Sequence, residues 1–107
     1  VDVDIFQGYP VTVNNPELTA QMLPSLKKAA GNGNVTEMQK ITGAEDFSFY
    51  ALQVPGLFVF LGGTPVDQDP LSAPSNHSPY FFADESSFKT GTATLTQLAL
   101  DYVATAK

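Results

Sequence analysis

Residues 57–61 form a run of five apolar side chains, LFVFL, between Gly56 and Gly62. A short continuous apolar run of this kind is typical of a strand that is buried on both faces of a sheet. Such a strand needs a neighbour on each side, because its backbone N–H and C=O groups must be paired. Few other segments of this 107-residue chain can supply these neighbours. The run therefore predicts a sheet of which the chain holds only a part.

The N-terminal segment is a second strand candidate. Val1, Val3 and Ile5 alternate with aspartates, and after an interruption at residues 8–10 the alternation resumes over residues 11–13. A period of two with one charged face predicts a half-buried strand. Residues 34–41 are a weaker strand candidate.

The segment after residue 14 predicts a helix with defined ends. Asn15 is suited to the N-cap, Pro16 to the first helical position, and Gly31 to the stop. The apolar stripe comprises Leu18, Met22, Leu26 and Ala29. Pro24 lies inside this helix, where it removes one hydrogen bond, so we expect a kink or a break there.

Two further helices are expected. Residues 42–45 (TGAE) match a capping box that would open a short helix through Tyr50 and Ala51. A last helix would follow Asp84 as N-cap, with an apolar stripe of Phe88, Leu95, Leu98 and Tyr102. The alternation of strands and helices predicts the α/β class, a layered sheet with helices packed on it.

The composition excludes several functions. The chain has 11 acidic and five basic residues, all five of them lysine, and a formal charge of −6, which argues against a nucleic-acid partner. It has no cysteine, so it cannot hold a disulfide or a thiolate metal site. No apolar stretch is long enough to span a membrane. Abundant Thr, Asn and Gln mildly favour an exported bacterial protein, but the location stays open between bacterial cytoplasm, periplasm and secretion.

A long loop without periodicity covers residues 62–83 and carries the single histidine, His77. Long structureless connections in compact domains are commonly functional or disordered. His77 could be a metal ligand or a general base at the carboxyl end of an α/β sheet. On the local sequence alone, an exposed loop histidine is the favoured interpretation, because one histidine does not make a metal site.

Two other residue pairs allow both a structural and a functional interpretation. Glu45 and Asp46 are explained by helix capping, and a role in orienting a metal ligand or binding a substrate amine is weaker from spacing alone. Gly62 and Gly63 would allow a ligand to approach the backbone, and a plain turn explains them equally well. No phosphate loop follows, because the required Lys-Ser/Thr is missing.

Three blocks in a fixed order resemble a known family. They are GYP at 8–10 with VNNP at 13–16; GAEDF at 43–47 with Tyr50, VPG at 54–56 and FVFLG at 58–62; and HSPYF at 77–81 with DE at 84–85 and Gly91. Together they are similar to the carboxyl-terminal part of the dinuclear-metal amidohydrolases and exopeptidases. That family includes hippurate hydrolase, N-acyl-amino-acid amidohydrolases (aminoacylases), plant indole-acetyl-amino-acid hydrolases and, more distantly, carboxypeptidase G and acetylornithine deacetylase.

The resemblance implies a fold and a domain division. Residues 1–12 would be the last strand of a ferredoxin-like lid or dimerisation domain together with the hinge. Residues 13–107 would be the carboxyl-terminal segment of a zinc-peptidase-like α/β/α catalytic domain. The partners implied are the missing N-terminal part of the enzyme and, at full length, a second subunit of a homodimer. No nucleic-acid or membrane partner is expected.

The resemblance also implies site residues. His77 matches a ligand of one of two divalent metal ions, zinc or else manganese or cobalt. Glu45 and Asp46 match an acidic pair beside that site, for which a supporting role is expected, and Gly62 with Gly63 would contact substrate. The general base would lie upstream, outside this chain. Two ions and the base would activate a bridging water for attack on the amide of an N-acyl amino acid or small peptide.

Two alternatives to an inactive enzyme fragment remain open at this point. The chain could be a stand-alone binding or regulatory module that keeps the fold segment without its chemistry. It could also reassemble noncovalently with another half after a nick. The length and ligand content of the natural polypeptide distinguish the fragment from the module.

Overall fold

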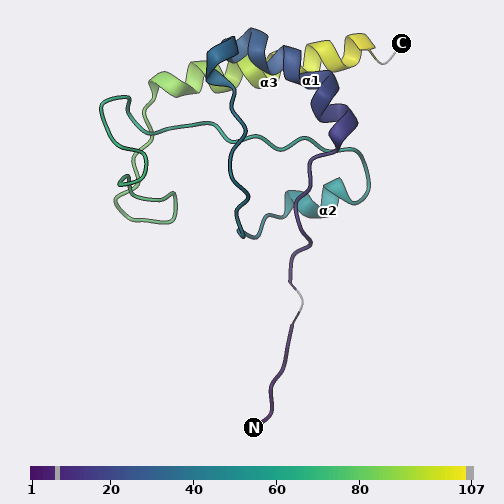
Figure 1. Ribbon diagram of the computed structural model, residues 1–107, viewed down its shortest axis with the longest axis vertical. Helices are drawn as coiled ribbons and strands as arrows, with labels where there is room; N and C mark the ends of the chain where they lie inside the picture. Colours follow the sequence, from purple (N-terminus) through teal and green to yellow (C-terminus); the bar gives the residue numbers. More distant parts are fainter. Residues whose placement is uncertain (7, 106–107) are drawn as a thin grey trace. The chain divides into compact units, whose positions relative to one another are not determined.

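The computed structural model describes residues 1–6 and 8–105, and its regular elements are helical (Figure 1). They are α1 (Pro16–Ala30), the short 3-10 helix η1 (Asn32–Asn34), α2 (Phe47–Ala51) and α3 (Ser86–Thr105). The chain divides into unit 1, Val1–Gln21 with Thr36–Phe58, and unit 2, Met22–Val35 with Val59–Lys107. Residue 7 and residues 106–107, which fall within the two predicted domains, lie outside the described part.

The three segments expected to be strands have no regular secondary structure in the described residues. A strand exists only when a neighbour pairs with its backbone, and these segments have no such neighbour here. Phe60 and Leu61, expected to be buried, are 61% and 50% exposed. The buried apolar side chains of the described chain are Met22 and Leu26. The α/β class therefore stays a prediction about a larger sheet.

The predicted ends of α1 are confirmed. The Leu18 N–H donates to Asn15 Oδ1 at 2.8 Å, which is the expected N-cap bond. At the other end, Gly31 has a φ of 91°, the left-handed region that glycine enters without strain, and its N–H donates to the Lys27 carbonyl. The helix is continuous through Pro24, so a break is wrong, whereas the alternative, a kink, stays a prediction. Loss of a single bond to the Ala20 carbonyl does not interrupt the neighbouring turns.

The start of α2 corrects the capping-box prediction. The helix begins at Phe47 rather than near residue 42. The Oε1 of Glu45 accepts from the Phe47 N–H at 3.2 Å, whereas a capping box would use the Thr42 N–H, and its carbonyl accepts from the buried Ser48 hydroxyl at 2.6 Å. These local bonds compete with helical geometry at residues 42–45 and delay the helix.

The predicted N-cap of α3 is confirmed. Asp84 Oδ1 accepts from the Ser86 N–H at 2.9 Å, and the Asp84 N–H donates to the Gly63 carbonyl at 2.7 Å. On the expected stripe, Leu98 is half-buried, whereas the other three side chains are exposed. These three are Phe88, Leu95 and Tyr102.

Unit 1 is held by the side-chain amide of Asn14. Its Nδ2 donates to the Phe58 carbonyl at 2.9 Å, and its Oδ1 accepts from the Phe58 N–H at 2.7 Å. The Asn15 N–H donates to the Gly56 carbonyl beside it at 2.9 Å. The rings of Phe47 and Phe58 lie 5.3 Å apart, and a Cβ on Gly56 would meet the Phe47 ring at 3.0 Å. One amide thus replaces a strand neighbour for Phe58.

In unit 2 the later part of α1 runs beside α3 (Figure 1). The hydroxyl of the buried Ser25 donates to Asp101 Oδ2 at 2.7 Å. Hydrogen bonds from Ser25 and Gln97 lower the pKa of Asp101 below its ordinary value of 3.8; burial partly opposes them, and the positive charge of Lys28 adds a smaller lowering. A Cβ on Gly91 would lie 2.6 Å from Leu61 Cδ2, so glycine permits the close approach of α3 to that residue.

Replacing Asn14 tests the clamp, by which we mean the two hydrogen bonds between the Asn14 amide and the Phe58 backbone. Asn14→Ala removes the two hydrogen bonds from the side-chain amide to the half-buried Phe58 backbone, a loss of about 1 kcal/mol each, so the Phe58 amide should exchange with deuterium about tenfold faster or more. Asn34→Ala, which removes an exposed bond to the Ala30 carbonyl, is the matched control and should leave Phe58 unchanged. Equal protection of Phe58 in the Asn14 variant would contradict the clamp.

Replacing Ser25 tests the contact between α1 and α3. Ser25→Ala removes the largest cause of the lowered pKa of Asp101, so that pKa should rise toward 3.8, as measured by NMR titration of the carboxyl carbon. Since the folded pKa lies below the unfolded one, the ionised carboxyl stabilises the fold above the unfolded pKa, and this stability is lost as the pH falls through the folded pKa. Thr92→Ala, on the exposed part of α3, is the control and should leave the titration unaltered.

Candidate functional site

The loop at residues 62–83 is built from successive local turns. The Ser78 N–H donates to the Ser75 carbonyl at 2.9 Å, and the Phe81 N–H donates to the Ser78 carbonyl at 3.1 Å. Ser78 Oγ also accepts from the Tyr80 N–H at 3.2 Å. His77 occupies the third position of the turn from Ser75 to Ser78. The expected absence of regular secondary structure in this loop is confirmed.

His77 is exposed at the surface of unit 2. Within residues 1–6 and 8–105, no three His, Cys, Asp or Glu side chains gather closely enough to hold a metal ion. A zinc ion requires about four donors, and one imidazole supplies one of them. The described residues therefore do not form a metal site on their own, and His77 can act only as a single donor to a site completed by other residues.

The two glycines expected to contact substrate differ in their surroundings. Gly63 is engaged in the fold, because its carbonyl accepts from the Asp84 N–H and a Cβ on it would contact the Ala83 Cβ at 3.4 Å. Gly62 is exposed, and nothing lies within 4 Å of the position a Cβ would take. Gly62 is therefore the more exposed of the two glycines.

A mainly apolar hollow of about 280 Å³ lies in unit 2. It is lined by Phe60, Leu61, Gly63, Thr64, Asn76, Phe81, Ala83, Ser87 and Phe88. The hollow brings Gly63 together with Asn76, the residue before His77. Sequence reasoning missed Phe81 and Phe88 as lining residues, since they come from different segments and no local pattern joins them. The hollow can enclose an apolar group beside neutral hydrogen-bonding atoms.

Glu45 and Asp46 belong to unit 1, whereas the glycines and His77 belong to unit 2. Glu45 is half-buried and uses one carboxylate oxygen to cap α2. Asp46 is exposed and makes no capping bond with its side chain. The structural interpretation of Glu45 is thereby supported, and the role of either carboxylate beside a metal stays a prediction.

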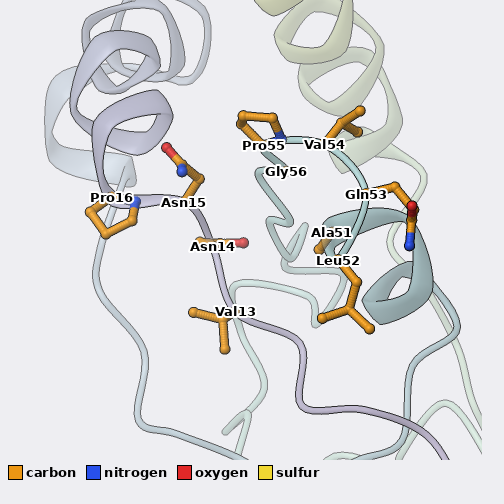
Figure 2. Close-up of a pocket in the computed structure, with 10 residues that line it drawn as sticks. All are labelled: Val13, Asn14, Asn15, Pro16, Ala51, Leu52, Gln53, Val54, Pro55 and Gly56. Carbon is orange, nitrogen blue, oxygen red and sulfur yellow. The ribbon is translucent and has the colours of Figure 1, made fainter.

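Unit 1 has a larger and more open hollow of about 410 Å³ (Figure 2). It is lined by residues 13–16, which enter α1, and residues 51–56, which follow α2. None of these ten side chains can act as an acid or a base near neutral pH. The amides of Asn14 and Asn15 are already bonded to Phe58 and Leu18. This hollow therefore lies beside the hydrogen bonds between Asn14 and Phe58 and offers no catalytic group.

Within the described residues, no helix is both long enough and apolar enough to cross a membrane.

Comparison with known proteins identifies relatives along nearly the whole chain. The chain is 37% identical over 94 residues to thermostable carboxypeptidase 2 of Saccharolobus solfataricus, covering 88% of this chain and 23% of the relative. It is 33% identical over 96 residues to the putative amidohydrolase YhaA of Bacillus subtilis, covering 90% of this chain and 24% of the relative. It is 35% identical over 95 residues to IAA-amino acid hydrolase ILR1-like 4 of Arabidopsis thaliana, covering 89% of this chain and 21% of the relative.

The chain therefore spans about a quarter of the length of these relatives. No solved structure matches it. Residues 1–101 match the model of peptidase family M20/M25/M40, the family whose blocks the sequence resembles. This match covers most of the chain, and the chain belongs to peptidase family M20/M25/M40.

Proposed function

We propose that this chain is part of a metal-dependent amidohydrolase or peptidase and supplies His77 as one metal ligand. The observation that carries the proposal is the position of His77. Its side chain is exposed in a hydrogen-bonded turn and directly follows Asn76, which lines the apolar hollow with Gly63. An exposed imidazole is accessible to an ion held by other residues. Family membership over residues 1–101 supports the same assignment.

The proposed substrates are N-acyl amino acids or small peptides. The relatives are named a carboxypeptidase, an amidohydrolase and an IAA-amino acid hydrolase, and these names share cleavage of an amide bond. The exposed backbone of Gly62 offers hydrogen-bonding groups to a substrate amide. The hollow between Phe60 and Phe88 offers an apolar surface to an acyl or side-chain group.

The proposed cofactor is a pair of divalent ions, zinc or else manganese or cobalt. Such ions polarise a carbonyl and favour deprotonation of a bound water. This chain would contribute one donor, and the other ligands and the general base would come from the rest of a longer protein. Glu45 and Asp46 are proposed to support the site rather than to transfer protons, because Glu45 is occupied in capping α2.

The proposed fold is an α/β domain completed by further strands, with residues 1–12 pairing in a lid that dimerises. Exposed apolar residues support this proposal, since large exposed apolar surfaces mark interaction sites. Val1, Val3 and Ile5 are 74–122% exposed on the expected apolar face of the first strand, and residues 59–61 are 45–61% exposed. Both segments have the side-chain pattern expected of strands.

Replacing His77 in the longer protein tests the metal-ligand role. His77→Ala should release one of the bound ions and lower kcat by about a hundredfold or more, because the ion and its polarising charge would be displaced. Metal content by mass spectrometry and hydrolysis of an N-acyl amino acid are the measurements. Gln68→Ala, an exposed residue of the same loop, is the matched control. Unchanged metal content in the His77 variant would refute the assignment.

The chain of 107 residues on its own tests the partial-enzyme proposal. It should not hydrolyse N-acyl amino acids when zinc, manganese or cobalt is added, because the described residues provide no cluster of ligands. Chromatographic removal of free metal followed by an amide-hydrolysis assay is the measurement. Hydrolysis that a chelator abolishes would contradict the proposal. A natural polypeptide of this length that binds ligand without hydrolysis would instead support the binding or regulatory module.

A further inference from the structure

The turn after α1 contains the sequence Gly31-Asn32-Gly33-Asn34 and forms the short helix η1. Residues 32–34 are all exposed. We infer that Asn32 is a site of spontaneous deamidation and isoaspartate formation, with the backbone amide of Gly33 as the nucleophile. The inference concerns the chemistry of the chain itself and does not depend on the proposed enzymatic function.

The reaction proceeds in two balanced steps. The Gly33 amide nitrogen loses its proton and attacks Cγ of Asn32, forming a new N–C bond, and the side-chain nitrogen leaves as ammonia. Water then adds to either carbonyl of the resulting cyclic imide and reopens the ring. Opening at one carbonyl gives aspartate, and opening at the other gives isoaspartate, whose main chain runs through the former side chain. No oxidant, reductant or cofactor is required.

The surroundings of Gly33 favour the first step. Glycine has no side chain to obstruct the attack, and nothing lies within 4 Å of the position a Cβ would take. No hydrogen bond from the Gly33 amide to any of the described residues is found. At the start of η1 the Asn34 N–H donates to the Gly31 carbonyl at 3.0 Å. Short 3-10 segments of this kind open easily, which lets Asn32 reach the geometry of attack.

The other four asparagines of the chain are less suited to this reaction. Asn14 has both amide atoms bonded to the Phe58 backbone, and Asn15 precedes a proline that has no N–H. Asn34 donates to the Ala30 carbonyl at 2.8 Å and precedes the β-branched Val35. Asn76 is exposed but precedes His77, whose side chain hinders the approach of its amide nitrogen. Asn32 alone combines exposure with a following glycine.

The modification would weaken the end of α1. A new carboxylate at residue 32 would lie next to the carboxyl end of the helix, where the peptide dipoles already place partial negative charge. Isoaspartate also adds a backbone atom to the turn, so the bond from Asn34 to the Ala30 carbonyl could not keep its present geometry. We therefore expect faster hydrogen exchange in the last turn of α1 after modification.

The test is ageing of the full chain in mildly alkaline buffer, followed by peptide mass mapping and labelling with an isoaspartyl methyltransferase. Isoaspartate is expected at Asn32 before any other asparagine. Gly33→Ala fits the open space at that position and should remove most of the signal, because the added Cβ hinders attack. A matched Gly8→Ala variant, also at an open position, should leave the signal unaltered.

Three results would overturn the inference. They are the absence of isoaspartate at Asn32 after ageing, a signal at Asn76 that equals or exceeds it, and an Asn32 signal that persists in the Gly33 variant. Circular dichroism of each variant before ageing checks that α1 is retained, so that loss of signal reports the chemistry rather than unfolding.

Discussion

The double hydrogen bond between the Asn14 amide and the Phe58 backbone is the contact on which the order of unit 1 depends. It joins residues 44 positions apart and bonds both backbone polar groups of one residue near the start of the apolar run. The bond from Asn15 to the Gly56 carbonyl and the packing of Phe47 on Phe58 lie directly beside it. An asparagine can make this contact because its side-chain amide carries both a donor for the Phe58 carbonyl and an acceptor for the Phe58 N–H.

The parts of the fold that could be predicted are those governed by neighbouring residues. Asn15, Gly31 and Asp84 act as caps where the sequence places them, because capping is decided within about four positions. The capping box at residues 42–45 failed for a local reason too, since Glu45 bonds to the Phe47 amide and moves the start of α2. The strands could not be verified, because pairing depends on chain distant in sequence and the described residues supply none.

The residues of the candidate site likewise fall into those that the sequence predicted and those that only the structure brings together. The sequence and its resemblance pointed to His77 and the glycine pair, and the structure places Gly63 on a hollow that also includes Asn76. Phe81 and Phe88 were not predicted as lining residues, because contact across the chain leaves no periodic signal. His77 itself is exposed, and the described residues gather no further ligands around it, so the proposed metal site would need donors from a longer protein.

The exposed apolar side chains have a consequence for how an isolated copy of the chain would behave in a cell. Phe60, Leu61 and the side chains along α3 are the kind of surface that chaperones and proteases of the quality-control system recognise. At neutral pH the net charge of −6 keeps copies apart by repulsion. Near the isoelectric point of about 4.3 that repulsion vanishes, and the exposed apolar side chains of neighbouring copies are then free to associate.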